Sequence, residues 1–188
     1  MCIVGFNTFI YSNLSLKKVI LLGYMGSGKS SVGSFLAEKL AINSYDLDKL
    51  IEEFQQKTIS DIFSEKGEIY FRKIESQALR EFLDNENSFV LALGGGTPCY
   101  ANNHELLQRD DVISVYLKTS VDTLVKRLKK EKNHRPLIAY LSDDELKDYI
   151  NKHLFDRNFY YHQAGYVVPT DDKTPSQIAD EILEIISL

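Results

Sequence analysis

The chain has 188 residues, of which 44% are apolar and 26% charged, and its net charge is −5. This composition suffices for a hydrophobic core and excludes disordered and fibrous classes, and the acidic balance offers no broad positive surface for a nucleic-acid backbone. Two cysteines, Cys2 and Cys99, are too few for a disulfide framework or a thiolate metal site, which favours the reducing cytoplasm. No apolar run reaches the roughly 18 residues of a membrane span, so we expect neither nucleic acid nor membrane as a partner.

Length predicts the domain organisation. One domain typically takes roughly 100 to 200 residues, so we expect a single domain over residues 17–188. Residues 1–16 form an N-terminal extension, which we expect to be a disordered tail or an added edge strand, or to reflect an early start codon. No Lys or Arg precedes the apolar stretch 1–11 and no small-residue cleavage pattern follows it, so a secretory signal is disfavoured.

Predicted strands and helices alternate along the chain. A short apolar run at 18–22 indicates a buried strand, a glycine-rich turn follows it, and apolar residues at helical spacing predict a helix over 30–40. The later elements, in chain order, are a strand at 42–45, a helix over 67–82, strands at 88–93 and 112–117, a helix from Ser120 toward Lys132, a helix from Ser142 toward Tyr161, a strand at 166–168 and a helix after Thr174-Pro175. This alternation predicts an α/β fold of three layers, built on a doubly wound, mainly parallel sheet.

The sharpest signal lies between the first strand and the first helix. Residues 23–30 read Gly-Tyr-Met-Gly-Ser-Gly-Lys-Ser, a phosphate-binding loop in the strand–loop–helix setting that its mechanism requires. Backbone amides and the helix N-terminus of such a loop surround phosphate oxygens, while Lys29 reaches the β- and γ-phosphates and the Ser30 hydroxyl binds Mg²⁺. The alternative to a phosphate-binding loop is a tight turn that has this residue pattern by chance. We predict that a nucleoside triphosphate is bound by Gly26, Ser27, Gly28, Lys29, Ser30 and Ser31.

Two acidic residues follow the second predicted strand. The strand at 88–93 carries no aspartate where many ATPases and GTPases use one to hold Mg²⁺, so another acid must help. In Asp46-Leu47-Asp48 the carboxylates are two residues apart, and in an extended segment both face the same way. One would face the metal and the other a substrate hydroxyl, and helix capping is the alternative role for such a pair.

Further motifs come later in the chain. They are the segment 62–75 (Ile-Phe-Ser-Glu-Lys-Gly-Glu-Ile-Tyr-Phe-Arg-Lys-Ile-Glu), the triple glycine 94–96, Arg135-Pro136-Leu137, and Arg157 followed four residues on by Tyr161. Together with the phosphate loop and the aspartate pair, these motifs resemble the shikimate kinase family over nearly the whole chain from Lys17 onward. The resemblance implies a P-loop kinase fold with a lid loop, and transfer of the ATP γ-phosphoryl group to the 3-hydroxyl of shikimate on the route to chorismate and the aromatic amino acids.

The resemblance also implies roles for residues of the acceptor site. Arg72 and Arg157 would hold the shikimate carboxylate, for which planar guanidinium forks are suited. Asp48 would hold the hydroxyls and accept the attacking proton, and we assign Asp46 with Ser30 to Mg²⁺. Glu75, one helical turn after Arg72, would orient that guanidinium. The site is completed by three glycines, Gly94, Gly95 and Gly96, of which Gly95 would donate its backbone N–H.

Three basic positions concern the nucleotide. Proline pushes the residue before it out of helical geometry, so we expect an extended loop at Arg135 that closes as a lid, and the resemblance implies that this arginine contacts the transferring phosphates. Arg127 matches the family position that stacks on adenine, with ordinary helix surface as the alternative. Lys173 stands where some family members have an arginine against the adenine, and lysine cannot stack in that way, so no contact is predicted there.

The expected enzyme uses ATP as co-substrate, Mg²⁺ as cofactor and Lys29, Asp48 and Arg135 as catalytic residues, and the family expectation is a monomer. Another kinase of the same fold, acting on gluconate or a nucleotide, is one alternative, and a silent ATP-binding regulator is another. A GTPase switch is disfavoured because no Asn-Lys-x-Asp stretch is present. The four histidines show no metal-ligand spacing and are expected at the surface, at positions His104, His134, His153 and His162.

Overall fold

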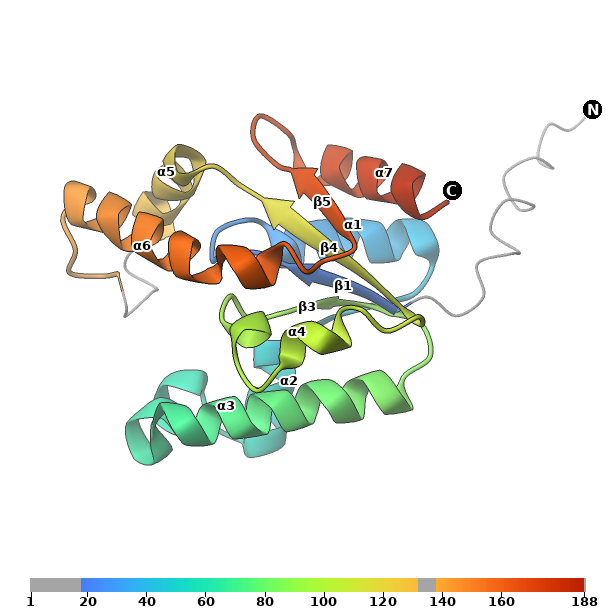
Figure 1. Ribbon diagram of the computed structural model, residues 1–188, viewed down its shortest axis with the longest axis horizontal. Helices are drawn as coiled ribbons and strands as arrows, with labels where there is room; N and C mark the ends of the chain where they lie inside the picture. The colour runs from blue at the N-terminus through green and yellow to red at the C-terminus, as the bar shows by residue number, and fades with distance from the viewer. Residues whose placement is uncertain (1–17, 132–137, 188) are drawn as a thin grey trace, which may run out of the picture.

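The computed structural model describes residues 18–131 and 138–187, so the extension at 1–16 and the lid position Arg135 lie outside the described residues. Strands and helices alternate as predicted (Figure 1). In chain order the elements are β1 (Lys18–Leu22), α1 (Lys29–Leu40), β2 (Asn43–Asp46), α2 (Leu47–Gln55), α3 (Ile59–Asn85), β3 (Phe89–Ala92), the 3₁₀ turn η2 (Thr97–Cys99), α4 (Asn103–Leu106), β4 (Val112–Lys118), α5 (Val121–Glu131), α6 (Asp143–Tyr161), β5 (Tyr166–Pro169) and α7 (Pro175–Ile186).

The five strands form one parallel sheet in the order β2-β3-β1-β4-β5. β1 occupies the centre and pairs with β3 on one side and with β4 on the other, so that Leu21 is in register with Ala92 and with Val115. All strands are parallel, and the segments that follow β1, β2 and β3 therefore emerge at the same edge of the sheet. This edge carries the phosphate loop, the aspartate pair and the triple glycine.

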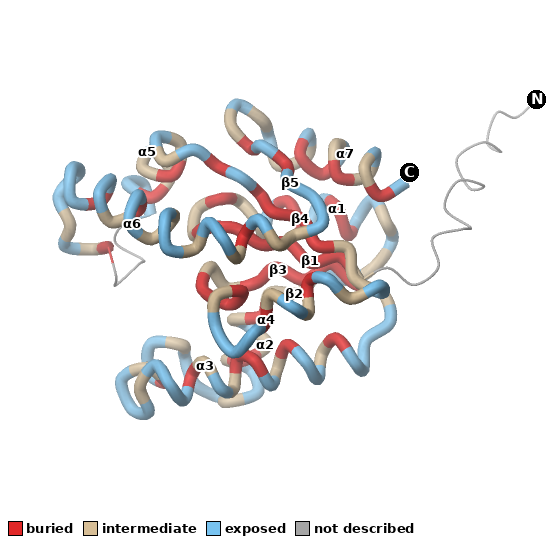
Figure 2. The backbone as a smooth tube through the Cα atoms, viewed as in Figure 1, coloured by how far each residue is buried: buried red, intermediate tan, exposed pale blue. Residues whose placement is uncertain are grey.

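Both faces of the sheet are covered, which makes the three predicted layers. Val19 and Leu21 of β1 pack with α1 and α7 on one face, whereas Ile20 and Leu22 pack toward α2, α3, α5 and α6 on the other. Burial follows this arrangement, because β1, β3 and most of β4 are buried, whereas the edge strands β2 and β5 and the outer sides of the helices are more exposed (Figure 2). An apolar strand without alternation is what two covered faces require.

One helix prediction is wrong at its beginning. The sequence pattern predicts a helix that begins at Gly67, but α3 begins at Ile59 and α2 precedes it. Gly67 has φ 79° and ψ 173°, which is non-helical, so it separates two helical pieces rather than starting one. The first piece was missed because it is mostly polar, with Ile62 as its only fully buried residue.

The other helix ends agree with their predicted signals. Ser142 and Thr174 each form a capping box at the start of α6 and α7, and the Ser120 hydroxyl accepts a hydrogen bond from the Thr123 amide at 3.3 Å before α5. Pro175 occupies the first turn of α7, where it costs no hydrogen bond. Within residues 18–131 and 138–187, no helix is both long and apolar enough to cross a membrane.

Candidate active site

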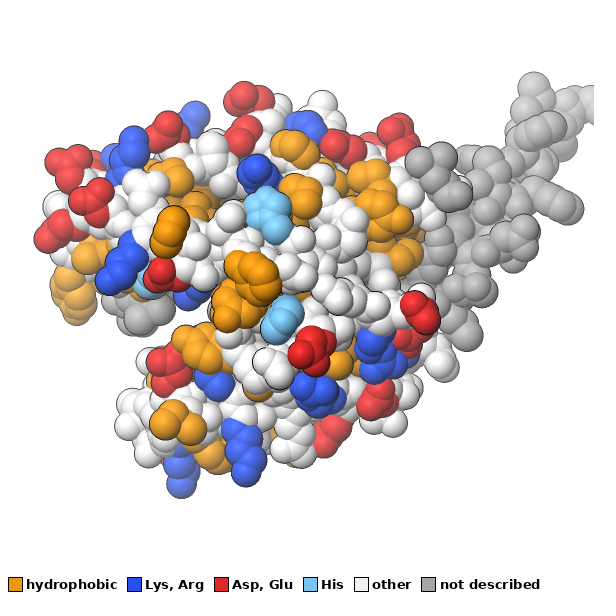
Figure 3. Space-filling model, in the orientation of Figure 1, with side chains coloured by type: hydrophobic (Ala, Val, Ile, Leu, Met, Phe, Trp, Pro, Cys, Tyr) orange, Lys and Arg blue, Asp and Glu red, His pale blue; other side chains and the backbone are white. Residues whose placement is uncertain are grey.

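A cavity of about 550 Å³ opens where the central strands end. It is bordered by the loop after β1, the last residue of β2 and the glycines after β3, with α5 and α7 contributing from the far side. Its wall comprises residues 25–32, Asp46, Asp48, Leu93, Gly94, Gly95, Arg127, Glu131, Lys173, Pro175 and Ile178. Next to it, the molecular surface is hollowed between α6 and the first part of α3 (Figure 3).

The phosphate loop has the geometry that binds anions. Gly28 adopts φ 96°, a left-handed conformation that glycine takes without strain, and α1 starts directly after it. Gly28 has no side chain that could cap the helix, so the first amides of α1 border the cavity. The Lys29 ammonium donates to the carbonyl oxygens of Gly23 at 2.9 Å and Tyr24 at 3.1 Å, which places its charge over the loop.

Ser30 and Asp46 meet beside this loop. The Ser30 hydroxyl donates to Asp46 Oδ2 at 2.8 Å, and Asp46 Oδ1 accepts from the Asp48 amide at 3.1 Å. The expectation that residues 46–48 are extended is wrong, because α2 begins at Leu47 and Asp46 is its N-cap. Capping and a site role therefore coexist: one Asp46 oxygen caps the helix and the other faces Ser30.

The carboxylate of Asp48 sits in an unfavourable place for a negative charge. Burial, followed by the nearby charges of Asp46 and Glu75, raises the pKa of Asp48 from 3.8 to about 6. Lys29 and Arg72 act in the opposite direction but do not offset these effects. A carboxylate of raised pKa on a cavity wall is suited to accept a proton near neutral pH.

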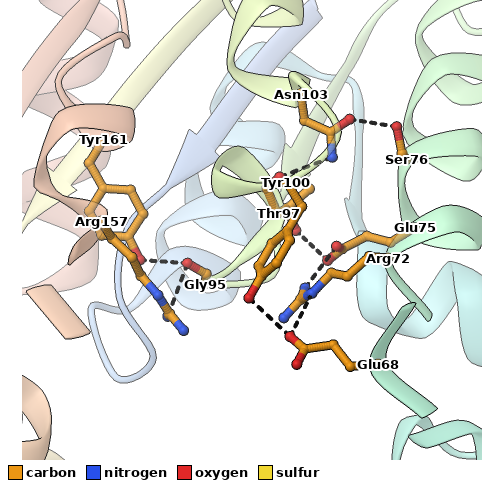
Figure 4. A network of polar contacts seen from close by, with 10 residues as sticks. All are labelled: Glu68, Arg72, Glu75, Ser76, Gly95, Thr97, Tyr100, Asn103, Arg157 and Tyr161. Atoms are coloured by element: carbon orange, nitrogen blue, oxygen red, sulfur yellow. Dashed lines mark hydrogen bonds and ion pairs between the residues drawn. The ribbon is translucent and has the colours of Figure 1, made fainter. Parts of the chain in front are cut away.

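The triple glycine lets three functional side chains approach the same stretch of backbone. A Cβ on Gly94 would lie 2.9 Å from Asp48 Oδ1, one on Gly95 would lie 3.4 Å from Arg157 Nη1, and one on Gly96 would lie 2.8 Å from Arg72 Nη2. The predicted acceptor residues therefore come together from α2, α3 and α6 around the residues after β3. Figure 4 shows Arg72 and Arg157 on opposite sides of this segment.

This crowding gives a testable expectation for Gly96. Gly96→Ala should displace the Arg72 guanidinium and raise the KM for the predicted acceptor, shikimate, roughly 10-fold, an effect of about 1.4 kcal/mol, while the KM for MgATP stays within about 2-fold. Steady-state kinetics with each substrate varied in turn would measure it. Gly165→Ala is the matched control, because its nearest contacts would be an ordinary 3.7 Å. An unchanged shikimate KM in Gly96→Ala would contradict the expectation.

Arg72 is held by two carboxylates (Figure 4). Its Nη1 donates to buried Glu75 at 2.8 Å, one helical turn away, and its Nε lies 3.3 Å from Glu68. Burial alone lowers the pKa of Arg72, but the charge and hydrogen bond of Glu75 outweigh it and raise the pKa. Glu75 in turn accepts a 2.6 Å hydrogen bond from Thr97, so the predicted orienting role of Glu75 agrees with the contacts.

Arg157 is fixed on the other side. Its Nη1 donates to the Gly95 carbonyl at 3.2 Å, and its guanidinium lies 5.5 Å from the centre of the Tyr24 ring. Tyr161, one turn later on α6, donates to the same Gly95 carbonyl at 2.6 Å. The Tyr24 hydroxyl also lies 3.2 Å from Nδ1 of His153, which like Arg157 belongs to α6. Tyr24 therefore connects the phosphate loop to α6.

Arg127 and Lys173 lie where α5 and the segment before α7 border the cavity. Arg127 Nη1 donates to the carbonyls of Gly26 at 3.1 Å and Ser27 at 3.2 Å, so it braces the phosphate loop in addition to lining the cavity. Lys173 also lines the cavity and pairs with Glu181. The predicted lid contact of Arg135 lies outside the described residues.

The prediction of surface histidines is partly wrong. His162 is exposed, but His153 is half-buried against the Tyr149 ring, and burial with the nearby Arg157 charge lowers the pKa of His153. His104 is also half-buried, and its ring lies 5.3 Å from that of Tyr160. Among the residues with described positions, no group of three His, Cys, Asp or Glu side chains is placed to hold a metal ion.

Comparison with known proteins settles the relationship. The family model for shikimate kinase matches residues 25–187. The chain belongs to the shikimate kinase family. Shikimate kinases of Flavobacterium psychrophilum and Flavobacterium johnsoniae are 52% and 49% identical to it, over 91% and 92% of this chain and 99% and 100% of theirs. The predicted family is confirmed, and with it an ATP-dependent phosphotransferase.

Solved structures of the family share the fold. The crystal structure of shikimate kinase from Bacteroides thetaiotaomicron superposes with a TM-score of 0.86 at 35% identity, covering 93% of this chain and 100% of that one. Shikimate kinase from Acinetobacter baumannii in complex with shikimate gives 0.81 at 35% identity, with coverages of 91% and 93%. The predicted P-loop kinase fold is therefore confirmed.

Some residues of the site carry no sequence signal. Tyr24 occupies an unspecified position of the phosphate-loop pattern, and Tyr100 lies outside the motifs that carry the family resemblance. Both act through side-chain contacts with residues far away in the chain, Arg157 and Arg72 respectively. Neither spacing nor periodicity reports such contacts.

Proposed function

We propose that the protein transfers the γ-phosphoryl group of ATP to the 3-hydroxyl of shikimate, which gives shikimate 3-phosphate and ADP on the route to chorismate and aromatic amino acids. The observation that carries this proposal is the convergence of Asp48, Arg72 and Arg157 on the three glycines beside the phosphate loop. A compact acid with several hydroxyls needs this set, with two guanidinium groups for its carboxylate and one carboxylate for its hydroxyls.

The residues around the cavity divide between the two substrates. The phosphate loop and Lys29 would hold the ATP phosphates, with Arg127 bracing the loop, while Arg72, Arg157 and the amide of Gly95 would hold shikimate. Asp48 borders both regions, because it lines the cavity and faces Gly94. It would orient the 3-hydroxyl and accept its proton as the phosphorus–oxygen bond forms, with ADP as leaving group. Arg135, which lies outside the described residues, would neutralise phosphate charge.

The donor set beside the loop fits Mg²⁺. A hydroxyl, Ser30, and a carboxylate, Asp46, face each other at 2.8 Å on the cavity wall, and both are oxygen donors of the kind that Mg²⁺ prefers. Mg²⁺ in kinases takes few protein oxygens and completes its coordination with phosphates and water, so a cage of several acids is not needed. When bound with ATP, the ion would neutralise negative charge on the phosphates.

The decisive experiment measures the release of ADP from Mg-ATP with and without shikimate by means of a coupled assay. Strong dependence on shikimate would support the proposal. Equal turnover with and without it, or dependence on gluconate or a nucleotide in its place, would refute it. A silent regulator would bind ATP and release no ADP, a reading disfavoured by the presence of Lys29 and Asp48 at the cavity.

Asp46 should determine the metal requirement. Asp46→Asn keeps an oxygen that can cap α2 but loses the negative charge beside Ser30, so the Mg²⁺ concentration for half-maximal activity should rise about 10-fold. Titrating MgCl₂ at fixed ATP and shikimate would measure this. Removal of the metal with EDTA should abolish turnover in both proteins. Asp180→Asn, on α7, is the control for a surface charge. An unchanged requirement in Asp46→Asn would remove Asp46 from the metal site.

The state of the enzyme in the cell is part of the same proposal. A cytoplasmic location is supported by the small number of cysteines, since the chain has two. A monomer is supported by the resemblance to the family. The domain boundary at residue 17 is supported by the position of β1, which begins at Lys18.

A further inference from the structure

A tyrosine outside the family motifs contacts one of the predicted shikimate-binding arginines. Tyr100 follows η2, and its ring centre lies 4.2 Å from the guanidinium carbon of Arg72. Its hydroxyl donates to Glu68 Oε1 at 3.0 Å, the same oxygen that receives Arg72 Nε at 3.3 Å. Tyr100 therefore holds Arg72 twice, directly through its ring and indirectly through Glu68 (Figure 4).

The contacts of Arg72 leave one part of the guanidinium facing the glycines. Nε is paired with Glu68 and Nη1 with Glu75, whereas Nη2 is the nitrogen closest to Gly96. The Tyr100 ring attracts the guanidinium from one side at 4.2 Å, and the two carboxylates hold it by Nε and Nη1. Together these three contacts restrict the orientation of the Arg72 fork.

The hydroxyl of Tyr100 is a reliable donor to Glu68. Burial, with the hydrogen bond to Glu68, raises the pKa of Tyr100, so the phenol stays protonated at neutral pH. Glu68 is about half-exposed, with 53% of its side chain accessible. An ion pair with an exposed glutamate alone holds an arginine weakly, because fixing the glutamate side chain in one rotamer costs conformational entropy. The Tyr100 hydroxyl restricts Glu68 and so makes the pair with Arg72 more persistent.

We propose that Tyr100 is a positioning residue for shikimate, which fixes the Arg72 fork in the orientation that receives the substrate carboxylate. The inference rests on the proposed function, because it assigns Arg72 to that carboxylate. Tyr100 does not act on the nucleotide, since it lies on the α3 side of the glycines and not on the wall of the nucleotide cavity. Removal of the Tyr100 side chain should weaken shikimate binding, and this effect should act only through the position of Arg72.

The test compares Tyr100→Ala with Tyr100→Phe. Tyr100→Ala removes both contacts and should raise the KM for shikimate about 3- to 30-fold, with kcat and the KM for MgATP within about 2-fold. Tyr100→Phe keeps the ring over Arg72 and should restore most of the affinity, to within about 3-fold of the wild type. Tyr166→Ala, a half-exposed tyrosine of β5 with 42% exposure, controls for loss of an aromatic side chain.

A substrate analogue separates positioning from a general structural role. The carboxamide of shikimate lacks the charge that Arg72 would bind, so its inhibition constant should be the same for the wild type and Tyr100→Ala. An equal weakening of shikimate and its carboxamide, or an unchanged KM for shikimate, would overturn the inference. If the wild type itself shows no shikimate-dependent ADP release, the proposed function fails first. If Arg72→Ala loses shikimate affinity and Tyr100→Ala does not, only this inference fails.

Discussion

Arg72→Ala should lower the affinity for shikimate about 100- to 1,000-fold, while the affinity for MgATP changes by less than about 3-fold. Removing one partner of a buried, charge-assisted contact typically costs about 2 to 5 kcal/mol, and about 1.4 kcal/mol corresponds to a factor of ten. The side chain of Arg72 is 17% exposed and is held by Glu75, so the contact with a carboxylate would form in a largely dry setting. Calorimetric titration with each ligand would measure both affinities.

Two companion variants keep the result for Arg72 interpretable. The substitution also leaves buried Glu75 without its arginine, so Arg72→Lys should be compared: it retains a charge near Glu75 and lacks the planar fork. We expect its loss of shikimate affinity to be about 10-fold or more. Arg80→Ala, two turns along α3 at an exposed position, is the control for removal of a charge. Equal losses for shikimate and MgATP in Arg72→Ala would contradict the assignment.

Asp48→Asn should bind MgATP normally but turn over about 100- to 10,000-fold more slowly. The range is that of general acid–base catalysis, since an amide is isosteric with the carboxylate but cannot accept the proton of the attacking hydroxyl. Rapid-quench measurement of a single turnover would isolate the chemical step from product release. Asp61→Asn, on the exposed first turn of α3, serves as the control. Near-normal turnover in Asp48→Asn would remove Asp48 from the mechanism.

The same substitution should make the folded protein more stable. The pKa of Asp48 is raised from 3.8 to about 6 on folding, so the folded chain binds more protons than the unfolded chain between these values, and stability falls as the pH rises through that window. Above about pH 6 the full penalty of about 3 kcal/mol applies, and Asn does not carry it. Thermal melts without divalent cations should therefore show a higher Tm for Asp48→Asn at pH 7.5, and a smaller difference near pH 4.

The fold was predictable wherever burial leaves a recognisable pattern of apolar residues in the sequence. β1, β3 and β4 are apolar runs covered on both faces, and the loop after β1 carries a motif whose residue order follows from its chemistry. The start of α3 was not predictable in this way, because residues 59–66 are largely polar and the helical pattern is interrupted at Gly67. A glycine inside a predicted helix marks either a start or a break, and only the backbone angles distinguish them.

The site was predictable as a set of residues and not as a set of contacts. Asp46 and Asp48 lie beside the phosphate loop as predicted, but their relative orientation depends on where α2 begins. The three residues Asp46-Leu47-Asp48 do not by themselves distinguish a helix N-cap from an extended segment. Arg127 was predicted either to stack on adenine or to lie on ordinary helix surface, and its donation to the loop carbonyls joins residues about a hundred positions apart. Contacts of this range follow from the topology of the sheet.

Tyr24 serves both halves of the site at once. Its carbonyl accepts from Lys29 of the phosphate loop at 3.1 Å, and its ring carries the guanidinium of Arg157. On the proposed assignment, in which Lys29 holds the nucleotide and Arg157 holds shikimate, a displacement of Tyr24 by either ligand would be transmitted to a residue that holds the other. Thermodynamic reciprocity then requires a single coupling free energy between the two ligands. The factor by which bound nucleotide changes the affinity for the acceptor equals the factor by which bound acceptor changes the affinity for nucleotide. Tyr24 is a side chain through which this coupling factor can be set.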